Sequence, residues 1–135
     1  MSWDVSILKL SRHYEAASEI PSDERLLPLG SRQEVHDAVL AVFPGTDWSD
    51  PGWGQWASDF GSIEFNLGKD DPADGMMLHV RAGPQVVPGI VQLCLGKGWQ
   101  GLDCSSGDFI ERSADPAKSL VAWQAYRDQV VGKRG

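Results

Sequence analysis

Apolar and polar residues alternate at the start of the chain, which predicts a β-strand with one buried face. Trp3, Val5 and Ile7 are apolar, and Asp4 and Ser6 stand between them. Successive side chains of a strand point to opposite faces of a sheet. We therefore expect the apolar set to face a core and the polar set to face the other side.

A helix is predicted after a long connection over residues 11–30, which are mostly polar and include two prolines. Ser31 and Glu34 have the spacing of a capping box, in which each side chain satisfies a free backbone N–H at the helix start. Pro44 and Gly45 would end this helix. The apolar residues between these limits recur at helical spacing and form one stripe: Val35, Ala38, Val39, Val42 and Phe43.

Two further alternating segments, residues 62–67 and 76–82, predict an antiparallel hairpin joined by a polar turn. In the simplest register of this hairpin, Glu64 faces His79. Residues 46–59 are rich in glycine, aspartate and tryptophan, and we expect them to form a loop before the hairpin.

The second half of the chain predicts two more helices with a short strand between them. Proline is tolerated in the first turn of a helix, so one helix would begin near Pro84 or Pro88 and end at the glycines that follow residue 95. A short strand is expected over residues 101–104. Asp115 as cap and Pro116 at the first position would open a final helix that runs to about residue 131. Its predicted apolar stripe is Leu120, Trp123, Tyr126 and Val130.

The predicted order of elements is β-α-β-β-α-β followed by a helix. This order is the ferredoxin-like, or split βαβ, arrangement of an α+β fold, with an antiparallel sheet and an extra C-terminal helix. Right-handed crossovers would place both early helices on one face of the sheet. The other face would be open, or partly covered by the last helix and the tryptophan-rich loop. A length of 135 residues fits a single α+β domain over residues 1–135.

Composition and charge narrow the classes of function. Apolar residues make up 41% and charged residues 23% of the chain, which is typical of a folded domain. The net charge of −7 argues against binding nucleic-acid phosphates. The sequence shows neither a signal-peptide pattern nor an apolar run long enough to span a membrane, and Cys94 and Cys104 lack metal-ligand spacing. We expect a cytoplasmic protein with reduced thiols and no membrane partner, in an oligomeric state that the sequence leaves open.

Most of the negative charge lies in one segment, which also carries three tryptophans. Residues 47–74 contain seven acidic residues and one basic residue. An acidic patch with exposed aromatic side chains would attract and anchor a basic protein partner. Two alternatives remain open, that the tryptophans pin the loop to the sheet and that the acids only increase solubility. The candidate partner-binding residues are Asp47, Trp48, Asp50, Trp53, Trp56, Asp70, Asp71 and Asp74.

The polar side of the predicted sheet is a second candidate site. A histidine beside a carboxylate is how a general base is oriented, and hydroxyl and amide groups could bind a polar ligand. A solvated sheet face with cross-strand charge pairs would show the same pattern. The residues expected on this face are Asp4, Ser6, Glu64, Asn66, His79 and Arg81.

Other chemical signals are weak. Cys104 could act as a nucleophile with His79 as its base, although a free cysteine is more often a small apolar side chain. The chain contains no glycine-rich phosphate loop and no Cys-x-x-Cys or His-x-x-x-His pair. The acids before Gly75 lack the alternate-residue spacing of a calcium loop. The sequence therefore predicts no catalytic residue, no cofactor and no metal.

The segment from Leu78 to Ile110 resembles a pattern found in a family of small uncharacterised bacterial proteins. The residues that carry this likeness are His79, Val80, Arg81, Gly83, Pro84, Gly98, Trp99, Asp103, Ser106, Gly107, Asp108 and Phe109. In size, acidity and α+β layout the chain also resembles bacterial toxin-immunity proteins. The local negative charge and the missing catalytic signatures predict a non-enzymatic protein-binding module with a basic partner, and the resemblance favours the immunity or adaptor kind. The alternative is a small enzyme or ligand-binding domain that uses the polar sheet face around His79 and Glu64.

Overall fold

β1 (Trp3–Leu8) is the first element of the computed structural model, which describes residues 2–132. Its side chains are alternately buried and half-buried. Trp3, Val5 and Ile7 lie in the core with at most 2% of their surface exposed. The predicted strand with one buried face is confirmed.

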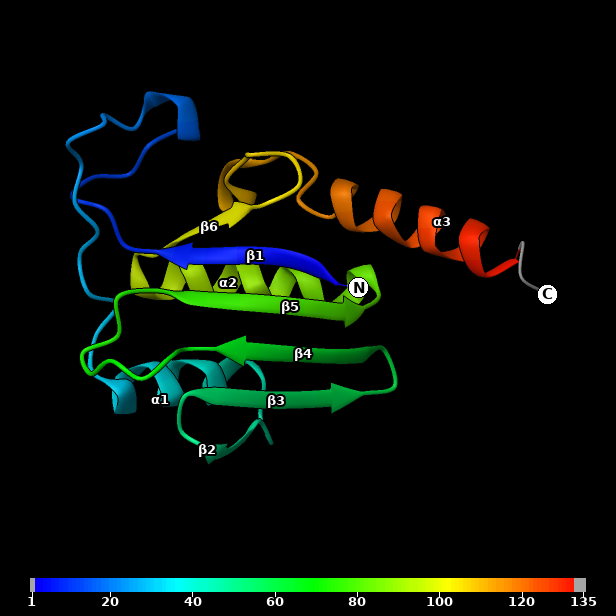
Figure 1. Cartoon of the computed structure of the whole chain (residues 1–135), viewed down its shortest axis with the longest axis horizontal. Helices are drawn as coiled ribbons and strands as arrows, with labels where there is room; N and C mark the ends of the chain where they lie inside the picture. Colours follow the sequence, from blue (N-terminus) through cyan, green and yellow to red (C-terminus); the bar gives the residue numbers. More distant parts are fainter. Residues whose placement is uncertain (1, 133–135) are drawn as a thin grey trace.

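Five more strands complete the sheet: β2 (Asp47–Asp50), β3 (Trp53–Ser58), β4 (Gly61–Asn66), β5 (Met76–Ala82) and β6 (Gln100–Asp103). Their order is β2-β3-β4-β5-β1-β6, and every neighbouring pair is antiparallel (Figure 1). The predicted α+β class and antiparallel sheet are confirmed. The predicted hairpin register is also correct, because Glu64 pairs with His79.

The prediction of a loop over residues 46–59 is wrong, since β2 and β3 form a hairpin there and extend the sheet to six strands. Gly54 lies within β3, opposite Phe65 of β4. A Cβ atom added at Gly54 would lie 2.8 Å from the indole ring of Trp48. Glycine here makes room for a packed tryptophan, although glycine in a sequence is usually a sign of a turn.

Two helices connect the strands where the sequence predicts them. α1 (Arg32–Val42) begins with the expected capping box, in which Ser31 Oγ accepts from Glu34 N at 3.1 Å and Glu34 Oε1 accepts from Ser31 N at 3.2 Å. α2 (Val87–Lys97) ends at Gly98, whose φ of +68° is a left-handed conformation that glycine adopts without strain. The described chain also contains short 3-10 helices at Ala17–Glu19, Pro84–Val86 and Ile110–Arg112.

The last helix, α3 (Lys118–Gly132), begins two residues later than predicted. The backbone carbonyl of Asp115 accepts from Lys118 N at 3.2 Å, so Asp115 and Pro116 form a turn before the helix. No helix in the part of the chain that the structure describes is long and apolar enough to cross a membrane.

The predicted apolar stripe of α3 is only partly correct. Leu120 is fully buried and Trp123 packs against the main core, but 58% of Tyr126 is exposed. The side chain of Val130 lies outside the described residues. Gln124 Nε2 donates to the carbonyl of Ala82 at 3.3 Å, which ties α3 to the end of β5.

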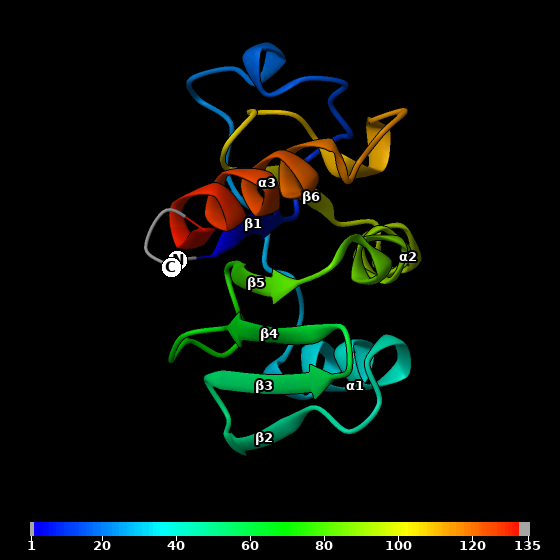
Figure 2. The ribbon, with the colours of Figure 1, turned by 90° about the vertical axis from the view of Figure 1, so that its right-hand side faces the viewer.

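The two faces of the sheet differ in what covers them. α1 and α2 lie together on one face and enclose the main core, and α3 lies beside the start of β1 (Figures 1 and 2). On the other face, Leu102 of β6 packs against a small second core, formed by Leu10, Tyr14 and Phe109. The predicted cover by a tryptophan-rich loop does not occur, because that segment belongs to the sheet.

Candidate functional site

The register of the sheet brings the six predicted polar residues onto one face. Asp4 of β1 pairs with His79 of β5, and His79 pairs in turn with Glu64 of β4. Ser6 and Asn66 both pair with Met77, and Arg81 follows His79 on the same side of β5. This face, which we call the polar face, is turned away from α1 and α2.

His79 is held by a carboxylate on the polar face. Its Nδ1 lies 2.9 Å from Asp4 Oδ1, and Ser2 Oγ donates to the same oxygen at 2.5 Å. About a quarter of the His79 side chain is exposed, 24%, against 39% for Asp4. When Nδ1 donates to Asp4, the neutral ring leaves Nε2 as an acceptor. The pair has the geometry of an oriented imidazole, which can accept a hydrogen bond or a proton from a ligand.

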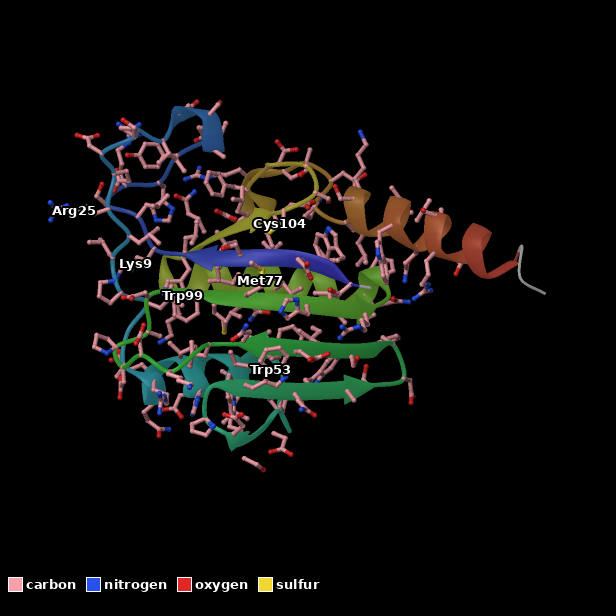
Figure 3. All side chains as sticks on the ribbon, viewed as in Figure 1. Lys9, Arg25, Trp53, Met77, Trp99 and Cys104 are labelled. Atoms are coloured by element: carbon pink, nitrogen blue, oxygen red, sulfur yellow. The ribbon has the colours of Figure 1, made fainter. Side chains whose placement is uncertain are left out.

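An aromatic side chain from β3, on the far side of β4, lies against this histidine. The rings of Trp53 and His79 are stacked, with their centroids 5.7 Å apart and their planes at 23°. Trp53 pairs with Asn66 and is partly exposed on the polar face (Figure 3). The position of Trp53 beside His79 was not predicted, because residues 46–59 were expected to form a loop. Apolar and polar residues do not alternate along Trp53–Ser58, so periodicity does not indicate a strand here.

The remaining charges of the polar face neutralise one another. Arg81 forms an ion pair with Glu64, and both side chains are partly exposed. Exposed ion pairs contribute little to stability. The pair does, however, occupy the carboxylate of Glu64, so Asp4 is the carboxylate that holds His79.

Cys104 lies beside Asp4, with its backbone N–H donating to the Asp4 carbonyl at 3.1 Å. Burial and the negative charges of Asp4 and Asp103 raise the pKa of the Cys104 thiol. A raised pKa keeps the sulfur as a thiol, whereas a nucleophilic cysteine needs the thiolate. The electrostatics of the site therefore do not favour Cys104 as a nucleophile.

The three tryptophans of residues 48–56 do not share one surface. Trp48 stacks on His36 of α1 with ring centroids 4.0 Å apart, and Trp56 meets Phe43 edge-on at 5.1 Å. Both pack against the main core and fasten the β2–β3 hairpin to α1. Only Trp53 lies on the opposite side of the sheet. Trp53 and Trp56 point to opposite faces because side chains alternate along β3, and the packing of Trp48 and Trp56 agrees with the alternative that tryptophans pin this segment.

The acidic residues gather around one end of the sheet. Asp47 and Asp50 of the edge strand β2 pair with Gln55 and Trp53. The turn after β2 meets the loop that follows β4, where Gly52 O accepts from Leu67 N at 2.9 Å (Figure 1). That loop carries the other acids. The acidic surface is formed by Asp47, Asp50, Asp70, Asp71 and Asp74, all of them exposed, and Trp53 pairs with Asp50.

Three of these carboxylates have fixed hydrogen bonds, and in one of them Asp50 Oδ1 accepts from Gly52 N at 2.9 Å. The Ser49 hydroxyl and backbone N–H both donate to Asp47 Oδ1, and these bonds lower the pKa of Asp47. Asp71 Oδ1 accepts from Arg32 N at 2.9 Å, at the start of α1. Hydrogen bonds donated to the ionised carboxylate favour its charged form, so Asp47 keeps its charge to a lower pH than an ordinary aspartate.

The described residues contain no group of three or more His, Cys, Asp or Glu side chains that could hold a metal ion. Cys94 is buried and Cys104 exposed, and each is a free thiol. Comparisons with protein-family models, with curated proteins and with solved structures found no match to this chain. The resemblance to toxin-immunity proteins therefore stays a prediction.

Proposed function

We propose that the chain is a non-enzymatic, cytoplasmic protein-binding module, of the immunity or adaptor kind, which binds a basic protein through the acidic surface and Trp53. The observation that carries this proposal is that five exposed carboxylates lie on β2 and on the loop after β4, and that Trp53, which pairs with Asp50, is a partly exposed aromatic side chain outside the main core. Trp53 stacks only on His79, whereas Trp48 and Trp56 pack against α1. An aromatic anchor with a charged rim is the usual composition of a protein-binding hot spot.

The order of strands supports a ferredoxin-like core for this module. β4, β5, β1 and β6 are consecutive in the sheet. α1 lies in sequence between β1 and β4, and α2 between β5 and β6. In this proposal β2 and β3 are an addition at the β4 edge of a split βαβ unit. The addition carries Trp53 and two of the five acids.

The charge of the acidic surface fits a basic partner. Its five carboxylates face solvent, and the one basic residue in the same segment of sequence is Lys69. The Lys69 carbonyl accepts from the guanidinium of Arg32 at 2.7 Å. A local charge of one sign accelerates encounter with a partner of opposite sign and orients it, most strongly at low salt.

Affinity capture with matched charge variants tests the proposal. Asp70→Lys with Asp74→Lys reverses two exposed acids for which no hydrogen bond is present among the described residues, and avoids Asp71, which binds the start of α1. Glu19→Lys with Asp23→Lys makes the same change of charge in the segment before α1. We expect a basic protein to be captured in equal amounts by the wild type and the Glu19/Asp23 variant, and lost from the Asp70/Asp74 variant. Equal capture by all three would contradict the proposal.

The polar face supports a second candidate function, a site for a small polar ligand or substrate. The observation in its favour is the Asp4–His79 contact of 2.9 Å, which orients an imidazole beside a stacked indole. A screen of small ligands by native mass spectrometry would compare wild type with His79→Ala and with His13→Ala, an exposed histidine outside this face. A ligand that binds wild type and His13→Ala but not His79→Ala would favour this function over protein binding.

A further inference from the structure

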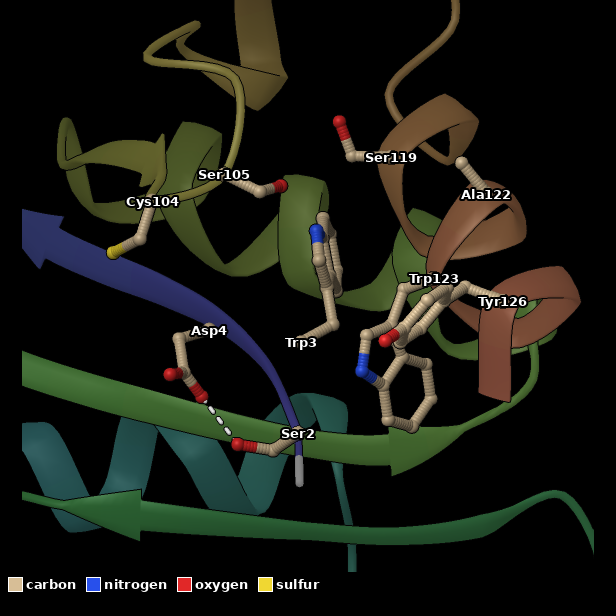
Figure 4. A pocket seen from close by; sticks show the side chains of 9 residues that line it. All are labelled: Ser2, Trp3, Asp4, Cys104, Ser105, Ser119, Ala122, Trp123 and Tyr126. Carbon is tan, nitrogen blue, oxygen red and sulfur yellow. Dashed lines mark hydrogen bonds between the residues drawn. The ribbon is translucent and has the colours of Figure 1, made fainter. Parts of the chain in front are cut away.

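A groove opens where α3 crosses the start of β1, at the end of the sheet opposite the acidic surface (Figure 1). Its volume is about 560 Å³, which is in the range of small-ligand sites. Residues from β1, from the turn after β6 and from α3 line the groove (Figure 4): Ser2, Trp3, Asp4, Cys104, Ser105, Ser119, Ala122, Trp123 and Tyr126.

The lining combines one carboxylate with aromatic walls. Asp4 provides the charge, and Trp123 and Tyr126 of α3 provide the aromatic surface. Asp4 Oδ1 is occupied by His79 and Ser2, but no hydrogen bond from the described residues reaches Asp4 Oδ2. This oxygen is free to accept from a ligand. Among the residues that the structure describes, no basic side chain lines the groove.

Two carboxylates act on the part of the groove that Cys104 lines. Asp4 and the neighbouring Asp103 both raise the pKa of Cys104. The guanidinium of Arg127 lies 5.0 Å from the centre of the Trp123 ring and is not among the described residues of the lining. A cation is stabilised over an aromatic ring by the ring quadrupole and beside a carboxylate by direct attraction.

Two hydrogen-bond donors near the groove have no partner. The indole nitrogens of Trp3 and Trp123 are buried without an acceptor in the described part of the chain. Figure 4 shows the Trp123 nitrogen on the side of that ring that faces Trp3. A buried unpaired N–H costs free energy, so a ligand that brings a carbonyl oxygen to it gains affinity.

We propose that this groove binds an organic cation, an ammonium or guanidinium group on an apolar chain, with Asp4 Oδ2 as its counter-ion. The apolar chain lies across Trp123 and Tyr126, and a carbonyl oxygen near the cation accepts from an unpaired indole N–H. Either a free small molecule or a lysine or arginine side chain of a polypeptide has this chemistry. The inference does not depend on the acidic surface, which shares no residue with the groove.

Binding of two isosteric ligands tests the charge directly. Nα-acetyl-arginine amide carries the guanidinium, and Nα-acetyl-citrulline amide replaces it with a neutral urea of the same shape. NMR titration that follows the indole N–H signals of Trp3 and Trp123 gives the dissociation constants. We expect the arginine compound to bind at least about 10-fold more tightly than the citrulline compound. Equal binding of the two, or no shift of either signal at about 10 mM of the arginine compound, would overturn the proposal.

Variants of the lining locate the site. Asp4→Asn keeps the shape of the side chain and removes its charge, and should weaken binding of the arginine compound by about 10-fold or more. Asp23→Asn makes the same change on an exposed loop and should leave binding unaltered. Tyr126→Ala, at a side chain 58% exposed, removes aromatic wall without disturbing the core and should also weaken binding. Unchanged affinity in both Asp4→Asn and Tyr126→Ala would contradict the proposed site.

Agmatine, which carries a guanidinium but no carbonyl, separates the two sources of ligand. Agmatine binding as tight as that of the arginine compound would overturn the proposed carbonyl contact and support a free organic cation, held by Asp4 and the aromatic walls, as the natural ligand. Binding of the arginine compound alone supports a side chain of a polypeptide. If neither agmatine nor the arginine compound binds, this inference is overturned. The proposal for the acidic surface is unaffected by that result, because the Asp70 and Asp74 variants test it separately.

Discussion

Asp103 shows how one buried carboxylate organises the turn after β6. Its Oδ1 accepts from Ser105 N at 2.9 Å, from Ser105 Oγ at 2.6 Å and from Ser106 N at 3.4 Å, and only 3% of the residue is exposed. Burial raises the pKa of Asp103, but the hydrogen bonds from Ser105, Ser119 and Ser106 outweigh burial and hold the pKa below its ordinary value of 3.8. The ionised form therefore stabilises the fold.

We expect the stabilisation of the fold by ionised Asp103 to be lost at acidic pH. A carboxyl group with a lowered folded-state pKa stabilises the protein above its unfolded value, here 3.8, and loses that effect as the pH falls through the folded value. We expect Asp103→Ala to lower the free energy of unfolding by about 1–3 kcal/mol at pH 7. The difference from wild type should shrink below pH 3.8. Urea denaturation at several pH values measures this difference in the free energy of unfolding, and Asp108→Ala, at an exposed residue, is the control. A difference that does not change with pH would contradict the stabilising role of ionised Asp103.

The two cysteines should differ in reactivity. Burial raises the pKa of Cys94 far above its usual range, whereas Cys104 is exposed with a pKa raised by partial burial, Asp4 and Asp103. We expect iodoacetamide at pH 8 to alkylate Cys104 alone in the folded protein, more slowly than a small-molecule thiol. Asp4→Asn should accelerate the reaction and Asp23→Asn should not. Mass spectrometry over time gives the rates, and a Cys104 faster than the free thiol would contradict the raised pKa.

At the scale of elements, the β2–β3 hairpin is the part that the sequence did not predict. Pro51, Gly52 and Gly54 are all turn-forming residue types, and apolar and polar residues do not alternate strictly along β3. In the structure Gly54 is required by the close approach of the Trp48 ring. Tertiary packing therefore determines the strand conformation of this segment, and the neighbouring residues in the sequence do not indicate such packing.

The elements that were predicted correctly have signals that depend only on neighbouring residues. The capping box of α1 is satisfied within four residues, and the Glu64–His79 register follows from strict alternation in two strands joined by a short connection. The polar face was predictable for the same reason. The groove could not be predicted from the sequence, because Trp123 and Tyr126 have the spacing of a buried helical stripe. Tyr126 is exposed because of the position of α3 beside β1, which the sequence does not show.

The docking of the hairpin gives a prediction about stability. Trp48 stacks on His36 and fills the space at Gly54, so Trp48→Ala should lower the free energy of unfolding by about 2–4 kcal/mol. Trp53 contacts only the polar face, so Trp53→Ala should cost about 1 kcal/mol or less. Chemical denaturation of both variants provides the comparison. Equal losses of stability in the two variants would contradict the prediction that Trp48 stabilises the fold more than Trp53 does.

Over the whole molecule, different surfaces have different chemistry. α1 and α2 cover one face of the sheet, and the polar face opposite them is uncovered over β1, β5, β4 and β3 (Figures 1 and 2). The acidic surface lies at one end of the strands and the aromatic groove lies at the other. Most of the net charge of −7 comes from the segment that forms the acidic surface. Because the negative charge is unevenly distributed, we expect a basic partner to approach the molecule at the acidic surface.

The rate of association with the captured partner, measured against salt concentration, tests that claim most directly. Attraction between opposite charges speeds association and weakens as salt screens it. We expect fast association for the wild type and for the Glu19/Asp23 control, falling steeply as salt increases. The Asp70→Lys, Asp74→Lys variant should associate more slowly and with a flatter dependence on salt. Association that is equally fast and equally salt-dependent in that variant would contradict binding through the acidic surface.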